Sequence, residues 1–136
     1  MSQPLNVLLV EDLEDDVELL VRELRRGGYE PNFERVDSLE GMTAALDRQK
    51  WDVVISDHNM PNFSAPAALK LLKERQQDLP FIIVSGNIGE DIAVASMKAG
   101  AHDYLMKGKL ARLVPAVDRE LREAEGRRAR RRSARR

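Results

Sequence analysis

The sequence predicts an α/β domain built on a doubly wound, five-stranded parallel sheet. Five short apolar runs alternate along the chain with five segments in which apolar residues recur at helical spacing. This alternation is typical of a parallel sheet with helices on both faces. Four of the five runs also end directly at charged or hydroxyl residues, and ligands bind at the carboxyl ends of strands in such sheets.

The first strand and the first helix have the clearest patterns. Leu5–Val10 is almost entirely apolar, as expected for a strand that is buried on both faces. Apolar residues then recur at helical spacing over residues 17–24, and Gly27 with Gly28 ends that helix. The short alternating stretch Asn32–Val36 predicts an edge strand.

The rest of the chain repeats this pattern. Asp37 or Ser38 can cap a helix over residues 42–46, and the apolar run Val53–Ser56 predicts a strand that ends at Asp57. The remaining elements are the helix Ala67–Glu74, the strand Phe81–Val84 ending at Ser85, the helix Ile92–Ala99 closed by Gly100, the strand Asp103–Met106 ending at Lys107, and the helix Leu113–Glu125.

Composition excludes several classes of protein. The 136 residues suffice for one domain, and the absence of cysteine excludes disulfides, thiolate catalysis and cysteine-based zinc sites. No apolar run approaches the roughly 20 residues that span a bilayer. The first residues, Met1–Pro4, lack the basic and apolar regions of a signal peptide. We therefore expect a soluble, cytoplasmic protein that makes no membrane contact.

The charge is divided unevenly along the chain. The net charge is −1, but seven arginines and no acidic residue occupy the last ten positions, so residues 1–126 carry −8. We expect residues 1–125 to form the domain and residues 126–136 to form an arginine-rich extension of the last helix or a tail. This segment can be a solvated extension, a link to an output module or a nucleic-acid contact, and we favour the first two.

The strand ends carry a coherent chemistry. Glu11 and Asp12 follow the first strand, Asp57 the third, Ser85 the fourth and Lys107 the fifth. The carboxyl ends of parallel strands meet at one edge, so these groups should converge. Crowded carboxylates favour Mg²⁺, one carboxylate can act as a nucleophile toward a phosphoryl group, and the lysine and serine can contact phosphoryl oxygens.

The loop Asp57-His58-Asn59-Met60-Pro61-Asn62 resembles the phosphoacceptor loop of response-regulator receiver domains, in a form close to that of the chemotaxis response regulator. The resemblance covers residues 5 to about 125 and implies a flavodoxin-like (βα)5 fold with strand order 2-1-3-4-5. The other residues that match the family are the acidic pair Glu11 and Asp12, the hydroxyl residue Ser85 with Gly86 beside it, and Tyr104 three positions before Lys107.

The resemblance implies a role for each matching residue. Asp57 is the phosphoacceptor, and Mg²⁺ is held by Asp12, Asp57 and the backbone carbonyl of Asn59, with Glu11 acting directly or through water. Lys107 and Ser85 contact the phosphoryl oxygens, and Ser85 moves together with Tyr104 as a two-state switch, in which Tyr104 starts from solvent.

The same resemblance implies the partners and the class of function. The chain should be a phosphorylation-dependent signalling switch of a two-component phosphorelay that accepts a phosphoryl group from a histidine kinase or phosphotransfer protein. It should catalyse only its own phosphorylation and dephosphorylation. A partner or a second copy is expected on the face formed by the Ile92–Ala99 helix and the Asp103–Met106 strand, and nucleic acid is not.

Two other functions stay open. The full set of site residues argues against a phosphate-independent interaction module on a receiver scaffold. Two departures from the family keep it open, namely Glu11, where the family more often has Asp, and Gly108, where it usually has Pro. An aspartyl-phosphate phosphohydrolase similar to haloacid dehalogenases needs an acid two positions after the nucleophile, and Asn59 stands there. The chain also leaves no room for the cap that selects substrates in such enzymes.

Overall fold

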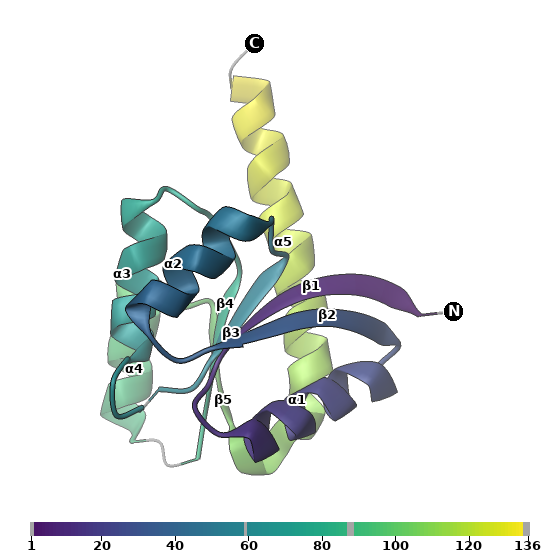
Figure 1. The fold of residues 1–136 in the computed structure, drawn as a ribbon. Coiled ribbons are helices and arrows are strands. Elements are labelled where there is room, and N and C mark those ends of the chain that lie inside the picture. Colours follow the sequence, from purple (N-terminus) through teal and green to yellow (C-terminus); the bar gives the residue numbers. More distant parts are fainter. Residues whose placement is uncertain (1, 59, 87–88, 135–136) are drawn as a thin grey trace.

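The five strands are parallel and form one sheet in the order β2-β1-β3-β4-β5. The structure is a computed structural model that describes residues 2–58, 60–86 and 89–134 (Figure 1). The predicted fold class and strand order are confirmed. The strands are β1 (Gln3–Val10), β2 (Tyr29–Val36), β3 (Val53–Ser56), β4 (Phe81–Ser85) and β5 (Asp103–Met106).

The helices alternate with the strands as the sequence predicts. They are α1 (Glu14–Arg26), α2 (Leu39–Arg48), α3 (Ala65–Glu74), α4 (Glu90–Ala99) and α5 (Leu113–Ala134), with a short 3₁₀ segment, η1 (Lys107–Arg112), between β5 and α5. Figure 1 shows α1 and α5 on one face of the sheet and α2, α3 and α4 on the other. Among the described residues, none of these helices has the length and apolar character needed to cross a membrane.

Two hydrophobic cores hold the layers together. On one face, the apolar side of α1 and the start of α5 pack on Val7 and Leu9 of β1 and on their neighbours. On the other face, α2 and α3 cover Leu8 and Val10, which point the opposite way from the same strand. The central strands are thus buried on both faces, which explains why their sequences are almost uninterrupted apolar runs.

Several element boundaries differ from the prediction, and the reasons are clear for the starts of β2 and α3. β2 begins at Tyr29 rather than Asn32, and the intervening Pro31 obscures a strand pattern. The added residues pair in parallel register with β1, and the buried Tyr29 hydroxyl donates a hydrogen bond to Asp118 of α5. α3 begins at Ala65 because the Ser64 hydroxyl accepts a hydrogen bond from a backbone N–H of its first turn.

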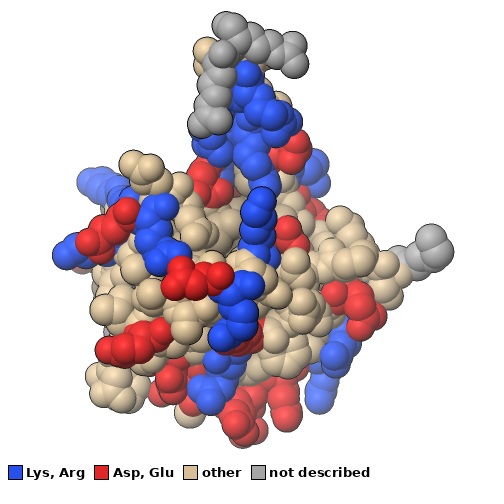
Figure 2. Space-filling model, turned by 45° about the horizontal axis from the view of Figure 1, so that its top comes forward, with Lys and Arg blue, Asp and Glu red and all other residues tan. Residues whose placement is uncertain are grey.

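The last helix runs well past the body of the domain. α5 extends to Ala134, and every described residue after Arg127 is exposed. Figure 2 shows Lys and Arg side chains gathered on this projecting end. Its base is tied to the loop before β4, because the Asp78 carboxylate accepts hydrogen bonds from Arg127 at 2.8 Å and Arg131 at 2.9 Å. Burial alone would raise the pKa of Asp78, but these two guanidinium groups outweigh it and lower that pKa.

We predict that Asp78→Asn frays the projecting part of α5. Loss of two partly exposed ion pairs should reduce the hydrogen-exchange protection of amides 128–134 by about threefold to tenfold. Hydrogen exchange with mass spectrometry measures this change. Glu125→Gln, which removes a carboxylate that pairs only with exposed arginines of the same helix, serves as the control. Equal protection in Asp78→Asn and the wild type would show that Asp78 does not anchor the helix.

Candidate functional site

The carboxyl edge of the sheet brings the predicted polar residues together. Glu11 directly follows β1, Asp57 directly follows β3, Ser85 ends β4 and Lys107 directly follows β5. The strands β1 and β3 are neighbours, and the Asp57 backbone N–H donates to the Val10 carbonyl at 2.8 Å. Parallel pairing therefore places groups that lie up to about a hundred residues apart in sequence at one edge.

Three carboxylates form a compact cluster at this edge. Ligand oxygens of Glu11, Asp12 and Asp57 all lie within 4.8 Å of one another. Glu11 is buried, Asp57 is almost buried and Asp12 is half-buried. Hard divalent cations with oxygen ligands, such as Mg²⁺, suit this donor set, because a cation offsets the mutual repulsion of the carboxylates. Among the described residues, this is the one cluster of at least three potential ligands close enough to share an ion.

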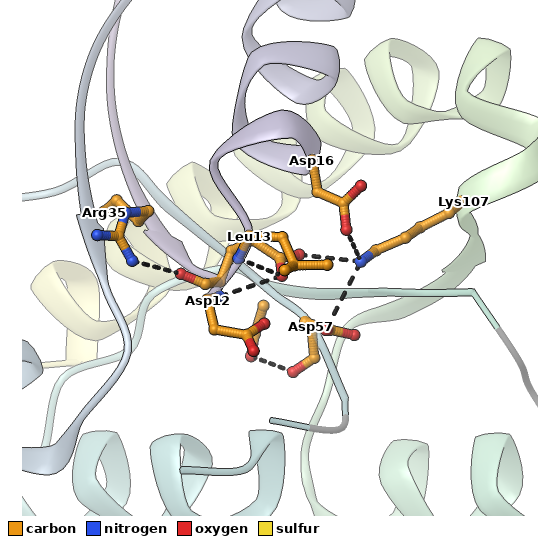
Figure 3. Close-up of polar contacts among 8 residues, drawn as sticks. Asp12, Leu13, Asp16, Arg35, Asp57 and Lys107 are labelled. Carbon is orange, nitrogen blue, oxygen red and sulfur yellow. Dashed lines mark hydrogen bonds and ion pairs between the residues drawn. The ribbon is translucent and has the colours of Figure 1, made fainter. Parts of the chain in front are cut away.

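The Lys107 ammonium group lies among carboxylates from three elements (Figure 3). Its Nζ is 2.5 Å from Oδ2 of Asp16, 3.0 Å from Oε2 of Glu11 and 3.6 Å from Oδ2 of Asp57. Burial alone would lower the pKa of Lys107, but hydrogen bonds to Asp16 and Glu11 outweigh it, so the pKa is raised. Lys107 therefore stays protonated and brings a positive charge to the edge of the cluster.

Glu11 is the most buried of the acidic groups at the site, with 1% of its surface exposed. Its Oε1 accepts hydrogen bonds from the backbone N–H groups of Asp12 at 3.1 Å and Leu13 at 3.3 Å, and its Oε2 faces Lys107. Burial raises the pKa of Glu11 to about 7, and the contact with Lys107 only partly offsets this rise. The glutamate side chain, which is one methylene longer than that of aspartate, thus brings Glu11 close to Lys107 as well as to Asp12 and Asp57.

Asp16 was not among the residues predicted for the site. It lies in the first turn of α1, next to Glu14 and Asp15, and acidic residues there usually stabilise a helix N-terminus. The sequence therefore offers an ordinary explanation for all three. Only the packing of α1 beside η1 shows that Asp16, 91 residues away in sequence, contacts Lys107.

Ser85 and Tyr104 come from the neighbouring strands β4 and β5, in which Ser85 pairs with Met106 and Tyr104 pairs with Ile83. Ser85 is buried, and Tyr104 is half-buried. We expected the Tyr104 side chain to start from solvent, but its hydroxyl is buried, close to the hydroxyl of Ser85. Burial raises the pKa of Tyr104, and the nearby Ser85 hydroxyl partly offsets this. The expected outward starting position is therefore wrong for this conformation.

The loop after Asp57 is only partly described. Asn59, whose backbone carbonyl we predicted as a metal ligand, lies outside the described residues. His58 is half-buried, and its ring centroid lies 6.1 Å from that of Tyr104. The Tyr104 ring thus borders both the buried Ser85 and the residue that follows Asp57.

Comparisons with known proteins agree on the family to which this chain is similar. A family model described as the response regulator receiver domain matches residues 7–118. The chain is 41% identical over 101 residues to the response regulator protein FleR of Pseudomonas aeruginosa. The matched region covers 74% of this chain and 21% of FleR. It is 35% identical over 117 residues to the transcriptional regulatory protein PrrA of Mycobacterium tuberculosis. That match covers 85% of this chain and 49% of PrrA. The chain thus spans between about a fifth and about half of these relatives.

A solved structure supports the fold. The signal receiver domain of the putative Luxo repressor protein from Vibrio parahaemolyticus superposes with a TM-score of 0.81. The superposition covers 93% of this chain and 96% of that one, at 24% sequence identity. At this level of identity, the similarity concerns the fold alone.

The raised pKa of Glu11 predicts a pH-dependent stability. The folded chain binds this proton more tightly than the unfolded chain, in which the pKa is near 4.5. The stabilisation is therefore complete below about pH 4.5 and is lost as the pH rises through about 7. Relative to Glu11→Gln, the free energy of unfolding of the metal-free wild type should fall by about 1–3 kcal/mol across this window.

Urea denaturation at several pH values measures the two stabilities. The exposed Glu14, in the first turn of α1, offers a control in Glu14→Gln, which should keep the wild-type pH dependence. A constant difference between the wild type and Glu11→Gln from pH 4.5 to 8 would contradict the assignment of the buried proton to Glu11.

Proposed function

Because this chain belongs to the response regulator receiver domain family, we propose that it is a phosphorylation-dependent switch of a two-component phosphorelay. In this proposal, Asp57 accepts a phosphoryl group from a histidine kinase or a phosphotransfer protein, which places the chain in the cytoplasm. The observation that carries the proposal is the position of Asp57, beside a potential metal cluster and 3.6 Å from a protonated lysine.

The chemistry follows from this position. A carboxylate oxygen of Asp57 attacks the phosphorus, and the bond between phosphorus and the donor nitrogen of the partner's histidine breaks as the new bond forms. Lys107 offsets negative charge on the phosphoryl oxygens, and Ser85 donates a hydrogen bond to one of them. Because the reaction needs mainly positioning and charge neutralisation, a site without a classical acid-base residue is sufficient.

The carboxylate cluster fits Mg²⁺. Glu11, Asp12 and Asp57 would hold the ion, together with the backbone carbonyl of Asn59 and water. Bound there, Mg²⁺ supplies the positive charge that lets a phosphoryl group approach several carboxylates. Asp57 would then present one oxygen to the phosphorus, with the Lys107 ammonium close enough to reach the phosphoryl oxygens.

We propose that Ser85 and Tyr104 carry the switch. Phosphorylation adds negative charge and strong acceptor oxygens beside Ser85, and the hydroxyl of Ser85 turns toward them. The buried Tyr104 hydroxyl lies close to that of Ser85, so the position of the Tyr104 side chain responds to the move. The equilibrium shifts by the difference in interaction free energy between the two states.

The output surface we propose is the face formed by α4 and β5. Apolar side chains are exposed there, with exposed fractions between 39% and 48% for Ile92, Val94, Met97 and Met106. Ser96 of the same helix, by contrast, is buried. Exposed apolar groups of this kind suit a partner protein or a second copy of the chain.

We predict that acetyl phosphate with Mg²⁺ adds one phosphoryl group to the wild type and none to Asp57→Asn. Asp57 then bonds to phosphorus as acetate leaves. Intact-mass spectrometry detects the adduct, and a metal chelator should prevent it. Asp91→Asn, on the exposed side of α4, should label like the wild type. Equal labelling of Asp57→Asn would exclude Asp57 as the acceptor, and no labelling of the wild type would favour the phosphate-independent module.

We predict that a phosphoryl mimic moves Tyr104 through Ser85. The chain has two tyrosines, so fluorotyrosine labelling gives two ¹⁹F signals, and Tyr29 is an internal control on the far strand β2. Beryllofluoride with Mg²⁺ should shift the Tyr104 signal and leave the Tyr29 signal in place. Ser85→Ala should reduce the shift strongly. A Tyr104 signal that ignores bound beryllofluoride would contradict the switch.

A further inference from the structure

We propose that Asp16 is a positioning residue that holds the Lys107 ammonium away from Asp57 until a phosphoryl group competes for it. This inference rests on the proposed function, because the competing group is a phosphoryl group on Asp57. It assigns to Asp16 a part in regulating the site, which neither the motif pattern nor the metal cluster suggests.

The Lys107 ammonium group lies at unequal distances from its three carboxylate partners. Lys107 Nζ is 2.5 Å from Asp16 and 3.6 Å from Asp57, so its nearest acidic partner is Asp16 and not the phosphoacceptor. Glu11, at 3.0 Å, is the third partner. Asp16 lies outside the cluster of three carboxylates that could share a metal ion, so it is a partner of Lys107 and not one of the potential metal ligands.

Asp16 is held more firmly than Lys107. It lies on α1, and the next residue, Val17, is buried in the core and donates its backbone N–H to the carbonyl of Leu13. Lys107 starts η1, and no atom lies near enough to pack against a side chain at the adjacent Gly108. The Lys107 ammonium stands at the end of a long side chain and is held by ion pairs, so a new anion on Asp57 would compete with Asp16 for it.

An ordinary helix-terminal role does not account for Asp16. Glu14 and Asp15 occupy the same turn and are exposed, as charges that interact only with the helix dipole usually are. Asp16 is instead half-buried, with 21% of its side chain exposed, and its carboxylate points at Lys107 in Figure 3. Asp15 thus provides a neighbouring acid of equal charge that lacks the contact under test.

Removing the Asp16 charge should free Lys107 for the phosphoryl group. We expect Asp16→Asn to raise the rate of Asp57 phosphorylation by acetyl phosphate by about threefold to fivefold, the factor that one partly exposed ion pair can supply. Asp15→Asn should leave the rate close to that of the wild type. Asp16→Glu keeps the charge and should behave like the wild type.

A second measurement tests the contact without phosphorylation. An acylating reagent modifies free amines, and peptide mapping separates Lys107 from the exposed Lys109, which is the internal reference. We expect Lys107 of Asp16→Asn to react about threefold to fivefold faster, relative to Lys109, than in Asp15→Asn or the wild type.

The two measurements separate the possible failures. Equal Lys107 reactivity in Asp16→Asn and Asp15→Asn would overturn the inference. It would also be overturned if Lys107 became more reactive in Asp16→Asn while the phosphorylation rate of that variant stayed unchanged. An equal rise in the phosphorylation rate of Asp15→Asn would also overturn it, since the cause would then be general charge. A wild type that gains no phosphoryl group would overturn the proposed function, while the reactivity of Lys107 would still show whether Asp16 holds it.

Discussion

The ammonium group of Lys107 is the interaction on which the site depends. Four carboxylates gather at the carboxyl edge of the sheet, from Glu11, Asp12, Asp16 and Asp57, and like charges this close repel one another. Lys107 contacts three of the four and offsets part of that repulsion. Burial raises the pKa of Glu11 to about 7, and the negative charge of Asp57 adds to this rise, while Lys107 only partly offsets it. The site is therefore prepared for further positive charge, which Mg²⁺ would supply.

The fold supplies this arrangement at low cost in local strain. Neighbouring parallel strands end at the same edge, so a residue placed directly after each strand reaches the site without an unusual backbone conformation. The two hydrophobic cores hold β1, β3 and β4 from both sides and make their ends rigid. The long side chain of Lys107 lies beside Asp57, and the ring centroid of Tyr104 lies 6.1 Å from that of His58. In our proposal, these are the groups that respond to phosphorylation.

The sequence predicts the fold and much of the candidate site because the relevant signals are local. The apolar runs define the strands, and Glu11, Asp57 and Lys107 follow them directly. Asp16 could not be found in this way, since its acidic neighbours give it an ordinary helix-terminal explanation and its contact is long-range. The buried position of the Tyr104 hydroxyl also depends on packing between strands rather than on local pattern. The projection of α5 depends likewise on Asp78, far away in sequence.

A structure of the chain with Mg²⁺ and beryllofluoride tests the central claim most directly, because it records where one ammonium group lies when an anion is present on Asp57. The account predicts metal bound by oxygens of Asp12 and Asp57, and Lys107 Nζ within hydrogen-bond distance of a fluorine and displaced from Asp16. A bound metal and beryllofluoride with Lys107 still on Asp16 would contradict the account, as would metal bound away from the carboxylate cluster.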